Sequence, residues 1–81
     1  MELREMAARQ YRDQEYMVKL GARIRQLREN RNWSQEHLSM LINMDVRQLG
    51  RIERAETNST ISMLKKTSEA LGISLSELFD F

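Results

Sequence analysis

Cysteine and proline are both absent from this chain of 81 residues. Without cysteine there can be no disulfide, thiolate zinc site or cysteine nucleophile, so nothing indicates an oxidising compartment. The charged amino terminus lacks the apolar segment of a secretory signal, and no apolar run approaches membrane-spanning length. The sequence therefore predicts a protein of the reducing cytoplasm. It also predicts a single small domain, because a chain this short does not hold two cores.

The net charge is only +1, which by itself is weak evidence for a nucleic-acid partner. The distribution of charge is more informative. Residues 18–33 carry five basic side chains against Glu29 alone, whereas residues 68–81 carry only acidic ones. Solvated helix faces would explain this pattern equally well, so charge alone does not decide the function.

Apolar residues recur at helical spacing through most of the chain, and strand-like alternation is hard to find. Together with cap residues, this spacing predicts five helices, over residues 18–31, 35–42, 46–54, 61–71 and 75–79. The expected caps are Ser34, Asp45, Thr60 and Ser74, and Gly72 is expected to end the fourth helix. Residues 1–17 have no clear apolar stripe, and we expect a helical extension there, separate from a domain of residues 18–81.

A very short turn joins the second and third expected helices. Asn43 stands where a left-handed residue ends a helix, and Asp45 can cap the next helix, with Gln48 spaced to complete a capping box. Two helices joined so closely must cross at a steep angle. The pattern predicts a helix-turn-helix whose second helix packs through one face and presents arginines on another.

Three longer stretches of sequence support this interpretation. The chain contains, in order over about residues 20–79, LGARIRQLRENRNWSQEHL, RIERAETN and LKKTSEALGISLSELF. Together they resemble the lambda-repressor-like, Cro-like helix-turn-helix proteins, often called the XRE family. The resemblance implies an all-α, five-helix DNA-binding domain and a transcriptional regulator, expected to be a repressor, that inserts helix 45–54 into the major groove of double-stranded DNA.

The resemblance also implies which residues touch DNA. Gln35 matches a position that contacts a phosphate and braces the recognition helix, and Arg47 and Arg51 match positions that reach base edges. Gln48 either reaches DNA or closes the capping box on Asp45. The full expected DNA-binding set is Ser34, Gln35, Val46, Arg47, Gln48, Arg51, Arg54, Asn58 and Thr60.

Arg28 and Glu53 match a family pair in which an arginine of the first helix bridges to a glutamate that ends the recognition helix. We expect a structural ion pair there. The sequence departs from the family pattern at Ala55, where glycine is favoured, and at Ser59, where proline is usual. Neither departure removes a base-reading position, but both fall in the loop that faces phosphates.

Two other classes of function compete with DNA binding. Catalysis is disfavoured because His37 is the only imidazole and Ser34 is needed as a cap, and no metal site or cofactor is expected. The same fold could instead serve as an antitoxin or adaptor that binds a protein partner, through residues 75–81 or the amino-terminal segment. Exposed Phe79 and Phe81 also suit a homodimer on an inverted-repeat operator.

Overall fold

The first described helix begins at a carboxylate cap. The computed structural model describes residues 11–81, and its α2 runs over Gln14–Glu29, with the Asp13 carboxylate accepting the N–H of Tyr16 at 3.0 Å. The helix begins at Gln14 rather than Val18 because this cap, with buried Met17 behind it, extends the apolar stripe backwards. The helix expected within residues 1–17 falls mainly on residues 1–10, which lie outside the described residues.

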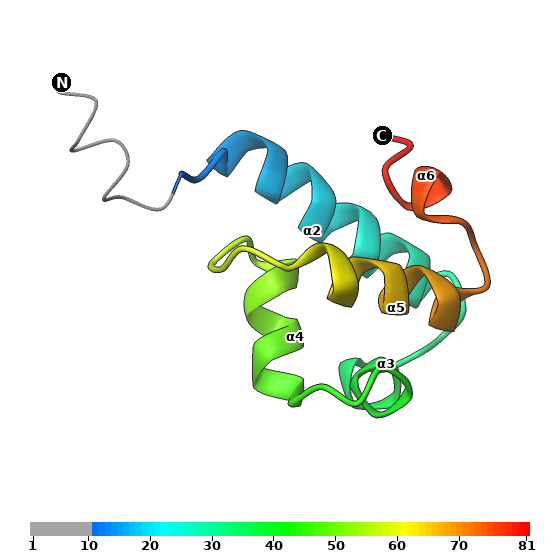
Figure 1. The fold of residues 1–81 in the computed structure, drawn as a ribbon. Helices are drawn as coiled ribbons and strands as arrows, with labels where there is room; N and C mark the ends of the chain where they lie inside the picture. The colour runs from blue at the N-terminus through cyan, green and yellow to red at the C-terminus, as the bar shows by residue number, and fades with distance from the viewer. Residues whose placement is uncertain (1–10) are drawn as a thin grey trace, which may run out of the picture.

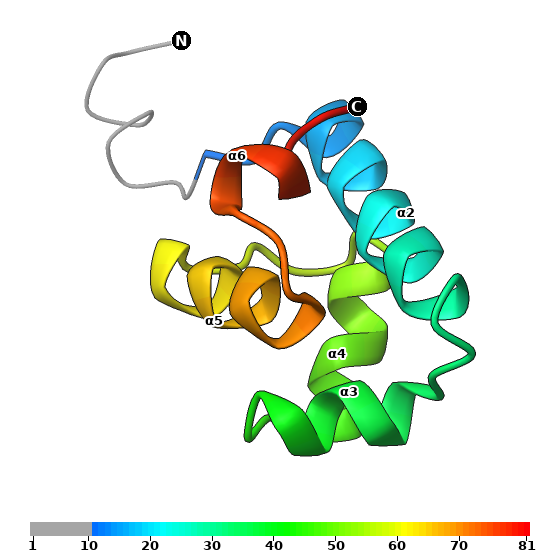
Figure 2. The ribbon, with the colours of Figure 1, turned by 90° about the vertical axis from the view of Figure 1, so that its right-hand side faces the viewer.

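The helix-turn-helix forms where the sequence predicts it. Helices α3 (Gln35–Leu41) and α4 (Val46–Glu53) are capped by Ser34 and Asp45, and Asn43 between them has a φ of 53°. Asparagine tolerates this left-handed conformation better than most residues do. In Figures 1 and 2, α3 crosses α4 near the beginning of α4. The predicted turn is therefore confirmed.

The remaining helices follow the predicted caps. Helix α5 (Ile61–Leu71) is capped by Thr60 and ends at Gly72, whose φ of 74° is left-handed. Helix α6 (Leu75–Leu78) begins with the expected capping box, in which the Ser74 hydroxyl accepts the Glu77 N–H and the Glu77 carboxylate accepts the Ser74 N–H, both at 3.1 Å. The described residues thus form five helices and no strand, which confirms the all-α prediction.

All five helices contribute to one core. Its largest fully buried apolar side chains are Ile24, Leu38, Ile42, Leu49 and Leu78. Figure 2 shows α4 between α2 and α5, with α3 across its lower end and α6 at the top of the bundle, opposite α3. None of the helices formed by residues 11–81 is long and apolar enough to cross a membrane.

Helices α2 and α4 approach each other unusually closely at a glycine. A Cβ atom on Gly21 of α2 would lie 2.6 Å from the carbonyl oxygens of both Ile52 and Glu53. Those carbonyls belong to the last turn of α4 and cannot rotate away without moving the helix. Gly21 therefore sets how deeply the end of α4 is seated against α2.

Arginines of α2 and of the loop after it stabilise the bundle rather than form a free cationic face. Arg31 donates to the carbonyl oxygens of Leu27 and Leu71, both at 2.7 Å, which ties the ends of α2 and α5 together. Arg23 donates to the carbonyl oxygen of Glu77 at 3.0 Å. Much of the basic charge between residues 18 and 33 is thus used inside the fold.

Candidate nucleic-acid interface

One face of α4 is packed and the opposite face is cationic. Leu49 and Ile52 are buried, whereas the Arg47 side chain is 80% exposed and Arg54 is 58% exposed. Arg51 is also exposed. This separation of faces follows from helical spacing, since residues one turn apart share a side of the helix.

The exposed side of α4 borders a shallow hollow against α3. The residues that line it are Gln35, Glu36, Val46, Arg47, Gly50, Arg51 and Arg54. Five of these were expected from the sequence to contact DNA, and the fold gathers them from two helices. The hollow is open and polar, which suits a large charged partner rather than an enclosed small molecule.

Asp45 is bonded to Arg47 in a way that overturns one expectation. The Asp45 carboxylate accepts the main-chain N–H of Arg47 at 2.8 Å, and its two oxygens also accept from Nε and Nη2 of Arg47, each at 3.2 Å. Gln48 instead donates its main-chain N–H to the Asp45 carbonyl, so the expected capping box with Gln48 does not form. Gln48 is exposed, which leaves its side chain available to DNA.

A second ion pair lies at the other end of α4. Arg54 donates from Nε to the Glu56 carboxylate at 2.8 Å. The guanidinium of Arg54 holds the pKa of Glu56 below its ordinary value, and the guanidinium of Arg47 does the same for the pKa of Asp45. Within residues 11–81, Arg51 forms no ion pair, although it lies close enough to lower the pKa of both carboxyls further.

A buried network fixes the end of α4 against the rest of the motif. Arg28 meets Glu53 through Nε at 2.8 Å and Nη2 at 2.9 Å, and its Nη1 donates to the Trp33 carbonyl at 2.7 Å. The Glu53 side chain is only 2% exposed, and its hydrogen bond raises the pKa of Arg28. Gln35 donates to the same carboxylate at 3.0 Å, so it braces α4 from α3.

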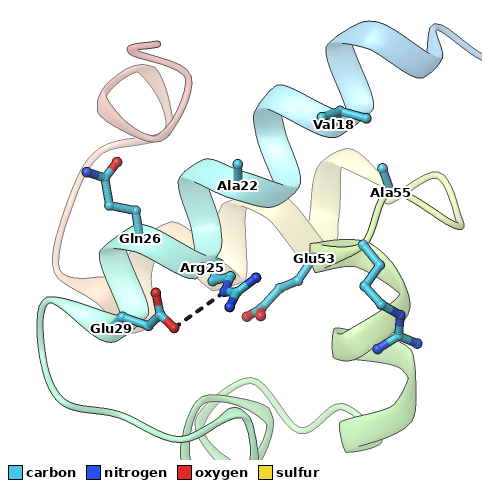
Figure 3. A pocket seen from close by; sticks show the side chains of 8 residues that line it. Val18, Ala22, Arg25, Gln26, Glu29, Glu53 and Ala55 are labelled. Atoms are coloured by element: carbon cyan, nitrogen blue, oxygen red, sulfur yellow. Dashed lines mark hydrogen bonds and ion pairs between the residues drawn. The ribbon is translucent and has the colours of Figure 1, made fainter.

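A second hollow, bordered by Glu53, lies between α2 and the last turn of α4. Figure 3 shows Glu53 reaching from α4 toward α2, while Arg25 and Glu29 pair along α2 itself. Ala55 borders the same hollow, and its φ of 60° is the left-handed conformation for which the family favours glycine. Gln14 donates to the Ala55 carbonyl at 2.8 Å, a contact joining residues far apart in the sequence.

Four expected DNA-binding residues, Ser34, Gln48, Asn58 and Thr60, do not line the hollow between α3 and α4. The hydroxyls of Ser34 and Thr60 accept main-chain N–H groups as helix caps, and the Asn58 amide donates to the Tyr11 carbonyl at 3.3 Å. The resemblance places Asn58 and Thr60 at phosphates, which lie outside the groove that α4 would enter. DNA contact by these residues stays a prediction.

The remaining polar residues do not suggest catalysis. The ring of His37 packs edge-on against the ring of Trp33, with centroids 4.9 Å apart, and Trp33 packs against the core. No group of three or more histidine, cysteine or carboxylate side chains within residues 11–81 could hold a metal ion.

Comparisons with known proteins decide the family. The sequence model of the helix-turn-helix family matches residues 24–78, which is more than half of the chain. This chain belongs to that lambda-repressor-like, XRE-type helix-turn-helix family. Its members are DNA-binding transcriptional regulators, which are not enzymes. A search of curated protein sequences gives no match.

Solved structures of other helix-turn-helix proteins share the fold. The restriction-modification controller protein C.AhdI from Aeromonas hydrophila is 37% identical, with a TM-score of 0.75 over 76% of this chain and 94% of that one. A transcriptional regulator from Vibrio cholerae is 29% identical, with a TM-score of 0.78 over 84% and 38%. The controller protein C.Esp1396I is 28% identical, with a TM-score of 0.74 over 80% and 84%.

Proposed function

We propose that this helix-turn-helix protein binds double-stranded DNA sequence-specifically and represses transcription by inserting α4 into the major groove. The observation that carries the proposal is the exposed row of Arg47, Arg51 and Arg54 on a helix whose other face is buried. A planar guanidinium can bind O6 and N7 of guanine together, which distinguishes guanine from the other bases. Val46, at the start of α4, is placed for a thymine methyl.

Position along α4 indicates which residues read bases and which contact phosphates. Arg47 and Arg51 lie toward the beginning and middle of the helix, where a recognition helix reads bases. Arg54 follows its last residue, and with Gln35 it is assigned to phosphates, which position the protein without reading sequence. These contacts act on DNA in the cytoplasm, the compartment that we propose.

We also infer a homodimer on an inverted repeat. Tyr16, Phe79 and Phe81 form an aromatic cluster, with Tyr16 and Phe81 ring centroids 5.1 Å apart. Tyr16 is 45% exposed and Phe81 is 47% exposed, whereas Phe79 is half-buried rather than exposed as expected from the sequence. Burying such rings between two copies would remove apolar surface from water. Sedimentation as a monomer, both free and on DNA, would exclude this arrangement.

The identity with C.AhdI supports a finer proposal about the genes controlled. Two of the solved relatives are restriction-modification controllers, and C.AhdI is matched over nearly its whole length. We infer that this chain likewise controls the genes of a restriction-modification system. A reporter fused to the promoter of a restriction-modification gene from the same genome should respond to this protein, and an unchanged reporter would exclude that target.

The central test is selection of the purified protein against a random duplex library at a stated, near-physiological salt concentration, because affinity for DNA depends steeply on salt. The Arg47→Ala, Arg51→Ala double variant serves as the comparison. We expect the native protein to enrich an inverted repeat and the variant to lose that preference. If neither protein enriches any sequence, DNA recognition is wrong and a protein partner, as for an antitoxin or adaptor, becomes the better proposal.

A further inference from the structure

Asp45 holds the guanidinium of Arg47 in a defined orientation. The carboxylate is itself fixed, because its Oδ1 accepts the Arg47 main-chain N–H at 2.8 Å as the cap of α4. From this position Oδ1 also accepts from Nε and Oδ2 from Nη2, so the guanidinium lies side-on to the carboxylate. The backbone thus orients the carboxylate, and the carboxylate orients the arginine.

This geometry leaves the useful edge of the guanidinium unoccupied. Arginine has five N–H donors, and the side-on contact uses Nε–H and one N–H of Nη2. The edge formed by Nη1 and the other N–H of Nη2 remains, and this pair of parallel donors matches O6 and N7 of guanine. The Arg47 side chain is 80% exposed, so that edge can meet a partner outside the protein.

Stability of the fold does not require this contact. The cap needs only the main-chain hydrogen bond, and an ion pair in water between exposed side chains contributes little to stability. Arg51 provides an internal contrast, since within residues 11–81 it has no ion-pair partner while projecting from the same helix. Of the two arginines proposed to read bases, Arg47 alone is therefore positioned by a carboxylate within residues 11–81.

We propose that Asp45 is a positioning residue that sets the guanine preference of Arg47, an inference that rests on the proposed DNA-binding function. Because Asp45 already holds the Arg47 side chain side-on, that side chain loses little rotational freedom when it binds guanine. Bound DNA would also exclude water from the Asp45–Arg47 ion pair, and the exclusion of water strengthens the pair. The same carboxylate repels phosphates of unrelated DNA. Asp45 thereby raises affinity for the correct base and lowers affinity for other sequences.

The test uses the full chain and an asparagine substitution. Asp45→Asn keeps the cap, because asparagine and aspartate cap helices about equally well, and Asp45→Ser serves as a second capping variant. Glu69→Gln is the matched control: it removes one carboxylate paired with a lysine, Lys65, on α5. Each protein is assayed on the duplex selected by the native chain and on all single base-pair variants of that duplex, with melting temperatures measured alongside.

Arg47→Ala and Arg51→Ala first identify the base pair that each arginine reads. We expect Asp45→Asn to relax the guanine preference about tenfold at the Arg47 base pair, within the range of one bidentate contact, and to leave the Arg51 base pair unchanged. Asp45→Asn should also bind unselected duplex more tightly, whereas Glu69→Gln should change neither quantity. Added to Arg47→Ala, Asp45→Asn should relax no preference further.

Other outcomes would overturn the role in distinguishable ways. Equal changes at every base pair would mean that Asp45 acts only through its charge, and relaxation at a different base pair would mean that Asp45 reads a base itself. A folded Asp45→Asn protein with unaltered preferences would remove the positioning role while leaving DNA recognition intact. If the native chain selects no sequence, the proposed function fails and this role fails with it.

Discussion

Gly21 of α2 lies directly against the carbonyl oxygen of Glu53, the last residue of α4, where a Cβ atom would approach to 2.6 Å. Because the neighbouring atoms are backbone, relief requires a shift of one helix. Overpacking of this kind costs about 3 kcal/mol at the upper end of its usual range. Alanine recovers about 1 kcal/mol of helix propensity. We therefore expect Gly21→Ala to lower the free energy of unfolding by about 2 kcal/mol, measured by denaturant titration.

Gly50→Ala is the matched control and has the opposite expected sign. A Cβ atom there would meet only the flexible end of Arg54, at 2.9 Å from Nη1. Stability should rise by up to about 1 kcal/mol from helix propensity. The new methyl group would stand in the hollow between α3 and α4 and displace Arg54, so affinity for DNA should fall. Equal stability changes for the two glycine variants would contradict the close approach of α2 and α4.

Arg28→Ala should unfold the protein more readily rather than simply weaken DNA binding. It leaves the Glu53 carboxylate buried with Gln35 as its remaining side-chain donor. Breaking a buried pair in this way costs about 3–5 kcal/mol. Removing both charges in Arg28→Met, Glu53→Leu should cost less, because no charge is stranded. An Arg28→Ala protein that keeps its melting temperature but loses DNA affinity would show that Arg28 acts at the interface instead.

Acid should remove the contribution that the capping box of α6 makes to the stability of the fold. The hydrogen bond from the Ser74 main-chain N–H holds the pKa of Glu77 below its ordinary value. A lowered folded-state pKa means stability that is present above the unfolded value of about 4 and lost as pH falls below it. We expect the melting temperature of the native protein to exceed that of Glu77→Gln at pH 7, and the two melting temperatures to become equal in acid. A difference that persists at low pH would contradict this assignment.

Local signals made much of this fold predictable. Four cap residues predict where helices begin, because the side-chain oxygen of each accepts a free main-chain N–H within the next few residues. They are Ser34, Asp45, Thr60 and Ser74. Asn43 does the same for the turn of the motif. The cationic face of α4 follows equally directly from helical spacing.

Contacts between distant segments leave little signal in the residues themselves, and the pairing of Arg28 with Glu53 was expected only from the family resemblance. A glycine inside a helix often has a packing reason, which was the one available signal for Gly21, yet its partner carbonyls belong to another helix. The Gln14 bond to Ala55 has no sequence signature at all. Gln48 has the correct spacing for a capping box, but the neighbouring Arg47 occupies the Asp45 carboxylate instead.

The short connections between successive helices have a kinetic consequence. Consecutive helices α3 and α4 pack together, as do α5 and α6, so many contacts close small loops. Helical proteins with such local contacts fold on microsecond to millisecond timescales. The chain also contains no proline, which removes the slow isomerisation phase that delays many proteins. A newly synthesised copy would therefore be folded almost at once, and on the proposed dimeric arrangement the association of two copies would set the delay before it could act.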